Sequence, residues 1–124
     1  MPKTILIVDD HADIRRLLRM TLEFEDYEIF EAGDGEAALR FLAERHADTV
    51  LLDVMMPGPL NGLDVCRRIR AGDQGHKAHV LLLSARGQAS DREAGLQAGA
   101  DAYLVKPFSP LQLIECLAGL PALA

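Results

Sequence analysis

Residues 4–10 read TILIVDD, an unbroken apolar run that ends in two aspartates. The runs TVLLD at 49–53 and HVLLLS at 79–84 have the same form, and continuous apolar runs are typical of strands buried on both faces of a parallel sheet. The run EIFEA at 28–32 alternates instead, which is typical of an edge strand. Five strands are therefore predicted, at Thr4 to Val8, Glu28 to Ala32, Thr49 to Leu52, His79 to Leu83 and Ala102 to Val105.

Helical patterns with recognisable ends separate these strands. The first predicted helix has an apolar face at helical spacing, made of Ile14, Leu17, Leu18 and Leu22. Residues that can cap a helix precede the other four helices, at Asp34, Asn61, Ser90 and Ser109. Glu93 completes a capping box with Ser90, and Pro110 occupies the first position of the fifth helix.

Strands that alternate with helices predict one α/β fold. Right-handed crossovers place helices on both faces of a five-stranded parallel sheet, which gives three layers with five helices. Because the edge-like strand is the second, the doubly wound order 2-1-3-4-5 fits best, with its switch point between strands 1 and 3. We expect residues 1–124 to form a single domain.

Composition narrows the class of protein. Hydrophobic residues make up 49% and charged residues 26%, which is typical of a globular chain and excludes disordered and collagen-like classes. The net charge of -6 argues against direct binding of nucleic acid or an anionic membrane. Cys66 and Cys116 lie far apart and predict neither a disulfide framework nor a zinc site, so a cytoplasmic location is expected.

Polar side chains gather where the predicted strands end. Asp9 and Asp10 follow strand 1, Asp53 follows strand 3, Ser84 follows strand 4 and Lys106 follows strand 5. Ligands of open parallel sheets bind at this edge, by the switch point. Converging carboxylates repel one another, so either some stay protonated or a cation is present, and oxygen ligands favour Mg²⁺. With Mg²⁺ bound, an aspartate there can act as a nucleophile toward a phosphoryl group, whose charge the lysine and serine help to neutralise.

Four motifs carry a resemblance to a known family. The runs ILIVDD, LLDVMMPG, LLLSA and YLVKPF, in this order, closely resemble the receiver domain of two-component response regulators of the chemotaxis-regulator type. The resemblance covers essentially the whole chain. It implies a flavodoxin-like three-layer sandwich and a phosphorylation switch rather than a turnover enzyme.

The resemblance implies a role for each acidic residue. Asp53 matches the phosphoacceptor, which also binds the metal ion. Asp10 matches a direct Mg²⁺ ligand, Asp9 a supporting acid that acts through water, and Met55 a ligand through its backbone carbonyl. The implied cofactor is Mg²⁺, for which Mn²⁺ can substitute.

The resemblance also implies the residues that transmit the signal. Ser84 matches the switch hydroxyl, Lys106 the lysine that pairs with the phosphoryl oxygens, and Tyr103 the aromatic that swings inward on activation. The bond from Lys106 to Pro107 matches the family's cis peptide. The implied phosphoryl donor is a histidine kinase or a histidine phosphotransfer protein. A downstream effector would bind at the face formed by helix 4, strand 5 and helix 5.

Three other functions fit the sequence less well. A dehalogenase-type phosphatase needs an acid two residues after its nucleophile, where this chain has Met55. A flavin carrier needs a phosphate loop rich in hydroxyls and glycine after strand 1, but that segment reads DDHADIRR. A receiver that signals without phosphate is disfavoured by the intact acidic set. His11, beside the acidic pair, could contact the site, but we expect it instead to be an exposed residue in the first turn of a helix.

Two features depart from the family pattern. The segment PGPLNG at 57–62 is one residue longer than usual and contains two prolines, which should alter and stiffen the loop beside Asp53. Ala102 stands at a position that is acidic in many receivers.

The fifth helix is apolar on more than one face, through Leu111, Leu113, Ile114, Leu117 and Leu120. Part of that helix is therefore expected to meet a partner or another domain, and the chain is either a stand-alone receiver or one cut from a longer protein.

Overall fold

The computed structural model of the chain describes residues 3–72 and 78–120. Five parallel strands form one sheet, in the order β2-β1-β3-β4-β5. The strands are β1 (Lys3–Val8), β2 (Tyr27–Ala32), β3 (Thr49–Asp53), β4 (His79–Ser84) and β5 (Ala102–Val105). The predicted strand order and the edge position of the second strand are confirmed, and each strand lies within one residue of its predicted bounds.

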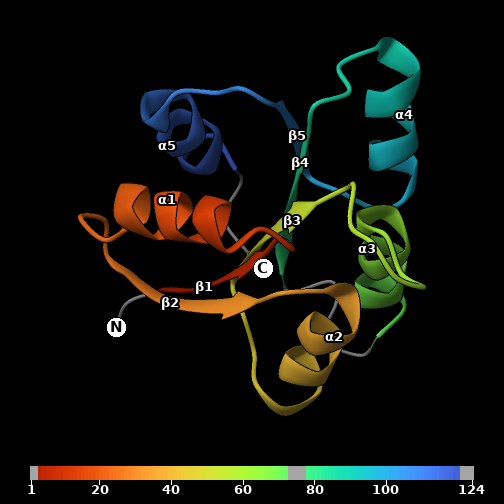
Figure 1. Cartoon of the computed structure of the whole chain (residues 1–124), viewed down its shortest axis with the longest axis horizontal. Helices are drawn as coiled ribbons and strands as arrows, with labels where there is room; N and C mark the ends of the chain where they lie inside the picture. The colour runs from red at the N-terminus through yellow and green to blue at the C-terminus, as the bar shows by residue number, and fades with distance from the viewer. Residues whose placement is uncertain (1–2, 73–77, 121–124) are drawn as a thin grey trace.

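Helices cover both faces of the sheet. They are α1 (Ala12–Leu22), α2 (Gly35–Glu44), α3 (Gly62–Ala71), α4 (Ala89–Gln97) and α5 (Pro110–Ala118). Helices α1 and α5 lie on one face, and α2, α3 and α4 lie on the other, which confirms the three predicted layers (Figure 1). In the described part of the chain, every helix is too short or too polar to cross a lipid bilayer.

The continuous apolar runs are explained by two cores, one on each face of the sheet. Successive strand side chains point to opposite faces, so a strand covered on both sides needs an apolar residue at every position. In β1, Ile5 and Ile7 enter the core beneath α1 and α5, whereas Leu6 and Val8 enter the core beneath α2 and α3. Each fully buried side chain of this size contributes about 1.5–3 kcal/mol.

The predicted caps of three helices are confirmed. The Asp34 carboxylate accepts a hydrogen bond from the Ala37 backbone at 2.8 Å. The Asn61 side chain accepts one from the Asp64 backbone at 2.9 Å, and the Ser109 hydroxyl accepts one from the Gln112 backbone at 3.1 Å. These bonds satisfy N–H groups that the first turn of a helix leaves without partners.

The predicted start of the fourth helix is wrong by two residues. Helix α4 begins at Ala89 with Gln88 as its N-cap, so Ser90 and Glu93 lie inside the helix. The carboxylate of Asp91 accepts a hydrogen bond from the Gln88 backbone at 3.2 Å. An acidic residue at the third helical position thus closes the first turn, two residues before the position at which Glu93 would close it.

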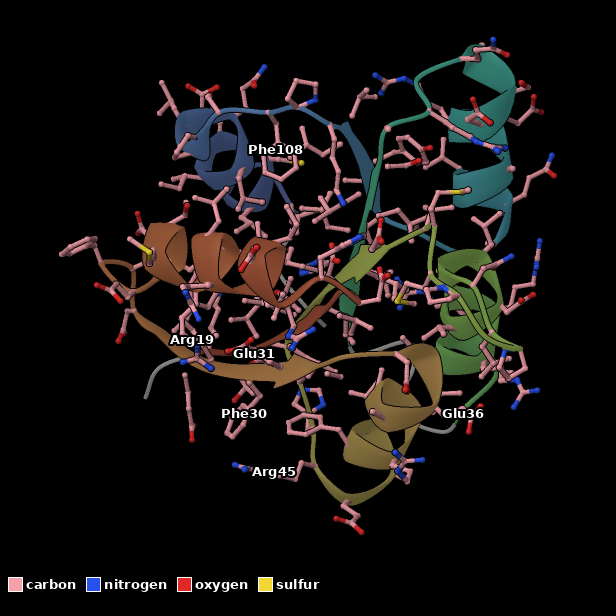
Figure 2. The ribbon with its side chains drawn as sticks, in the orientation of Figure 1. Arg19, Phe30, Glu31, Glu36, Arg45 and Phe108 are labelled. Atoms are coloured by element: carbon pink, nitrogen blue, oxygen red, sulfur yellow. The ribbon has the colours of Figure 1, made fainter. Side chains whose placement is uncertain are left out.

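Exposure of the apolar helix faces also differs from prediction. Leu18 and Leu22 of α1 are buried, but Leu17 is exposed, because it lies 100° around the helix from Leu18, at the margin of the apolar face. Arg19, on the same helix, donates a hydrogen bond from its Nε to the Glu31 carboxylate of β2 at 2.7 Å (Figure 2). On α5, Leu113 and Leu117 are buried, Ile114 is half-buried and Leu111 is exposed; Leu120, which the prediction placed in this helix, lies beyond its end and is half-buried. Most of the apolar surface predicted for that helix therefore packs within the domain.

Candidate functional site

The residues singled out at the predicted strand ends meet at one edge of the sheet. Asp53 and Ser84 are the last residues of β3 and β4, and Lys106 directly follows β5. Asp9 and Asp10 directly follow β1, which pairs with both β2 and β3. The strand order changes direction here, so the helices that follow β1 and β3 depart to opposite faces and leave these carboxylates in the crevice between them.

The ammonium group of Lys106 joins two buried carboxylates. Its Nζ lies 3.3 Å from Asp9 Oδ2 and 3.3 Å from Asp53 Oδ1, and both aspartate side chains are almost completely buried. The Lys106 backbone N–H donates to the Ser84 carbonyl at 2.8 Å, which continues the pairing of β5 with β4 beyond the strand. The peptide bond from Lys106 to Pro107 is cis, as the resemblance implied.

The carboxylates could hold a divalent cation. Asp9, Asp10, Asp53 and the adjacent His11 each offer one donor atom, and these atoms all lie within 4.8 Å of one another. Asp10 Oδ1 is buried and accepts no hydrogen bond from any described residue. A buried oxygen without a partner is costly, and carboxylate oxygens are the ligands that Mg²⁺ prefers. The residues present therefore fit the cation that the sequence predicted.

The pKa of Asp53 lies above its ordinary value. Burial raises it most, since burial disfavours the charged form, and the neighbouring Asp9 carboxylate raises it further. The Lys106 ammonium and a hydrogen bond from the Met55 backbone act in the opposite direction but only partly offset the burial. The ionised site is therefore electrostatically strained, and a bound cation would relieve that strain.

A glycine positions the backbone that carries Asp53. Helix α3 begins at Gly62, whose N–H donates to the Val54 carbonyl at 3.0 Å. A Cβ at Gly62 would lie 2.2 Å from the Asp53 carbonyl oxygen, a separation that no side chain tolerates. Sequence reasoning noticed Asn61 as a cap but missed the role of Gly62. The signal was the glycine itself, at a helix start nine residues after Asp53.

Ser84 and Tyr103 are linked through one residue of the loop between β4 and α4. The Ser84 hydroxyl accepts a hydrogen bond from the Arg86 N–H at 3.1 Å, and the Tyr103 hydroxyl donates one to the Arg86 carbonyl at 2.7 Å. Tyr103 and Arg86 also line a groove of about 550 Å³, whose other wall includes the exposed Met55. Tyr103 therefore lies beside this groove, where its hydroxyl is held by the loop.

His11 is nearer the acidic residues than the sequence indicated. It is the N-cap of α1 rather than a residue of its first turn, and 65% of its side chain is exposed, as expected. Its Nδ1 nevertheless lies 3.2 Å from Asp9 Oδ1 and 3.3 Å from Asp10 Oδ1. The available signal was its position, directly after the acidic pair.

Comparisons with known proteins agree with this architecture. A family model described as the response regulator receiver domain matches residues 5–118. The transcriptional regulatory protein ResD of Bacillus subtilis is 47% identical over 110 residues, which cover 89% of this chain and 44% of ResD. The chain spans about half the length of the curated relatives it matches.

Two solved structures show the same fold. The chemotaxis protein CheY4 of Vibrio cholerae superposes with a TM-score of 0.91 at 30% identity, covering 98% of this chain and all of that one. The receiver domain of a sensor histidine kinase from Pseudomonas aeruginosa superposes with a TM-score of 0.85 at 32% identity, covering 94% of this chain and 95% of that one. That receiver domain was crystallised with a magnesium ion coordinated in its active-site cleft.

Proposed function

Because this chain belongs to the response regulator receiver family of two-component signalling, we propose that Asp53 accepts a phosphoryl group from a phosphohistidine donor. The observation that carries the proposal is the surroundings of Asp53. Its buried carboxylate lies 3.3 Å from the Lys106 ammonium and within the same cluster as Asp9 and Asp10. Asp9 also lies 3.3 Å from this ammonium, but its Oδ1 accepts a hydrogen bond from the His11 N–H at 2.8 Å. Asp53 is the last residue of β3 and stands in the motif LLDVMMPG, which resembles the acceptor segment of the family.

The chemistry is transfer of a phosphoryl group to oxygen. A carboxylate oxygen of Asp53 attacks phosphorus, the bond from phosphorus to the donor's imidazole nitrogen breaks, and the donor histidine leaves with the electron pair. Lys106 neutralises charge that develops on the phosphoryl oxygens. Asp10, Asp53 and the Met55 carbonyl would hold Mg²⁺, with Asp9 acting through water. Bound there, the ion would supply further neutralisation of the phosphoryl oxygens.

The hydrogen bonds at Arg86 provide a route for the signal. When Ser84 turns its hydroxyl toward a phosphoryl group on Asp53, it releases the Arg86 N–H. Tyr103 is bonded to the carbonyl of the same residue, so a shift of Arg86 changes the support of the Tyr103 ring. Tyr103 belongs to β5, so the change reaches the face formed by α4, β5 and α5, where an effector would bind.

The proposed partners follow from this chemistry. A histidine kinase or a histidine phosphotransfer protein supplies the phosphoryl group, and an effector domain or protein reads the altered face. Receivers of this family act as switches, and the exposed Met55 provides no acid beside Asp53 for the turnover chemistry of a dehalogenase-type phosphatase.

The proposal is tested by incubation with Mg²⁺ and acetyl phosphate, followed by measurement of the intact mass. We expect one phosphate adduct in the wild type, dependent on Mg²⁺, and none in Asp53→Asn. Asp48→Asn is the matched control, because Asp48 lies at the opposite edge of the sheet, where it accepts a hydrogen bond from the Thr4 N–H at 2.7 Å. An adduct that persists in Asp53→Asn, or a wild type that takes up neither phosphate nor beryllofluoride, would overturn the proposal.

A further inference from the structure

The acidic cluster contains a nitrogen donor that the phosphoryl chemistry does not use. Imidazole Nδ1 of His11 lies 3.2 Å from Asp9 Oδ1 and 3.3 Å from Asp10 Oδ1. Ligand atoms at adjacent positions of an octahedral ion are about 3 Å apart, and atoms at opposite positions about 4.2 Å apart, when each bond is about 2.1 Å long. The donor atoms of Asp10, His11 and Asp53 lie within 4.8 Å of one another, which is close to that size, and Asp9 lies within the same distance of them, where it would act through water.

His11 can present Nδ1 to a cation in exchange for one contact, the 3.2 Å interaction of that nitrogen with Asp9 Oδ1. It occupies the N-cap of α1 but makes no side-chain cap hydrogen bond, so rotation of the imidazole leaves the helix start intact. The ring is 65% exposed, so its second nitrogen can carry the proton in contact with water while Nδ1 offers its lone pair. Asp10 Oδ1, which has no hydrogen-bond partner among the described residues, lies next to that nitrogen.

We propose that His11 is a nitrogen ligand of the cation site and gives it a preference for first-row transition-metal ions over Mg²⁺. The inference rests on the proposed function, because it adds one ligand to the site that holds the cation there. Imidazole binds Ni²⁺ and Zn²⁺ well, whereas Mg²⁺ favours oxygen and water, so His11 strengthens the binding of the first group selectively. The ligand class is a divalent transition-metal cation.

Two measurements on the whole chain test this assignment. The first is electron spin echo envelope modulation of the Mn²⁺-loaded protein, which detects a coordinated ¹⁴N nucleus directly. The second is calorimetric titration with Ni²⁺ and with Mg²⁺. The test variant is His11→Ala. The matched control is His46→Ala, since His46 is a partly exposed histidine whose Nε2 lies 3.3 Å from a carboxylate oxygen of Asp48 at the other edge of the sheet.

We expect ¹⁴N modulation in the wild type and in His46→Ala and its loss in His11→Ala. We also expect His11→Ala to weaken Ni²⁺ binding by about tenfold while Mg²⁺ binding changes by less than about twofold. Mn²⁺ bound without ¹⁴N modulation would overturn the role of His11 and leave the proposed Mg²⁺ site standing. A wild-type protein that binds neither Mn²⁺ nor Mg²⁺ would overturn the proposed site and this inference together.

Discussion

Aspartates lie at both edges of the sheet, but their hydrogen-bond partners and charged neighbours differ between the edges. At the amino edge, Asp101 Oδ2 accepts hydrogen bonds from the Arg70 guanidinium at 2.6 Å and from the Val80 N–H at 2.8 Å. Asp48 likewise accepts from the Thr4 N–H. At the carboxyl edge, Asp9 and Asp53 lie beside each other with Lys106 between them, and Asp10 Oδ1 has no hydrogen-bond partner among the described residues.

The difference separates a structural use of carboxylates from a functional one. The amino-edge aspartates receive backbone N–H groups, which ties the strand starts to neighbouring loops and satisfies the charge. The carboxyl-edge aspartates also accept from backbone N–H groups, those of His11 and Met55, but they lie against one another, and Asp10 Oδ1 has no hydrogen-bond partner among the described residues, at a cost that burial increases. Replacement of a buried, clustered aspartate such as Asp53 by asparagine should therefore raise stability near neutral pH, whereas the same replacement of Asp101 at the amino edge should lower it.

Removal of the Arg70 side chain should have the largest effect on stability. Arg70 donates to the carbonyls of Ala78 at 2.6 Å and Gly99 at 2.7 Å, in addition to Asp101. Arg70→Ala removes the side-chain donor from both carbonyls and from Asp101, which keeps its bond from the Val80 N–H, so we expect the free energy of unfolding in urea to fall by about 2–3 kcal/mol. Arg67→Ala is the control on the same helix, because Arg67 pairs only 3.2 Å from the exposed Asp64 and should cost less than about 0.5 kcal/mol. Equal losses in the two variants would contradict a structural role for the amino edge.

Gly62→Ala tests whether the close approach of α3 to the backbone of Asp53 and Val54 is needed at the carboxyl edge. The new methyl group would meet the Asp53 carbonyl and the Val54 Cα, which lies 2.7 Å away, so α3 must shift. We expect a loss of about 1–3 kcal/mol in urea unfolding, as for other overpacked sites. In the control, Gly72→Ala, the nearest atom lies 3.5 Å away. If Gly62→Ala is no less stable than Gly72→Ala, the close approach of α3 does not position Asp53.

Asp53→Asn should stabilise the protein in a manner that depends on pH. The folded-state pKa of Asp53 is raised by burial above its ordinary value of 3.8, so the folded protein binds this proton more tightly than the unfolded chain does. The wild type therefore loses stability as pH rises from that value through the folded pKa, and Asp53→Asn does not undergo this loss. Relative to wild type, we therefore expect the variant to become progressively more stable as the pH rises toward neutrality, with no such gain in acid.

The check is thermal unfolding of the wild type and Asp53→Asn across this pH range in the absence of divalent cations. Asp101→Asn serves as the contrasting variant, since it loses a charge-assisted bond to Arg70 and should be less stable than the wild type near neutral pH. A stability difference between wild type and Asp53→Asn that stays constant with pH would be incompatible with a raised pKa.

Ser84→Ala should have the smallest effect on stability. The substitution removes one acceptor, which leaves the Arg86 N–H without its 3.1 Å bond and costs at most about 1 kcal/mol. Ser84→Thr keeps the hydroxyl and should lie closer to the wild type. Chemical denaturation of the wild type and the two variants measures their order of stability. A fall in the free energy of unfolding above about 2 kcal/mol in Ser84→Ala would contradict this expectation and indicate a structural role for Ser84.

The sequence was sufficient for the fold because its strongest signals are periodic. The unbroken run at Ile5 to Val8 indicates a strand covered on two faces, and the alternation at Glu28 to Ala32 indicates an edge strand. With the second strand at an edge, the doubly wound order 2-1-3-4-5 fits best, and this is the order in the structure. The start of α4 was missed because Gln88 with Asp91 and Ser90 with Glu93 both satisfy a capping pattern. Local pattern alone does not choose between two overlapping starts.

The candidate site was predictable to the level of which residues meet. Strand ends identified Asp9, Asp53, Ser84 and Lys106 because parallel strands bring their carboxyl ends to one edge. The role of Gly62 was not predictable, because the close approach of α3 to the Asp53 carbonyl is a property of packing. The orientation of His11 toward the acids depends on its rotamer at the helix start, which the sequence does not specify.

The most direct test of the contrast between the edges is the effect of Mg²⁺ on thermal unfolding of the wild type, Asp10→Asn and Asp101→Asn. Ligand that binds only the folded state stabilises it by about 2.7 kcal/mol at a hundredfold excess over its dissociation constant. We predict that Mg²⁺ raises the melting temperatures of the wild type and Asp101→Asn equally, from a lower starting value in the latter, and leaves Asp10→Asn nearly unchanged. An equal rise in Asp10→Asn, or no rise in the wild type, would contradict the account.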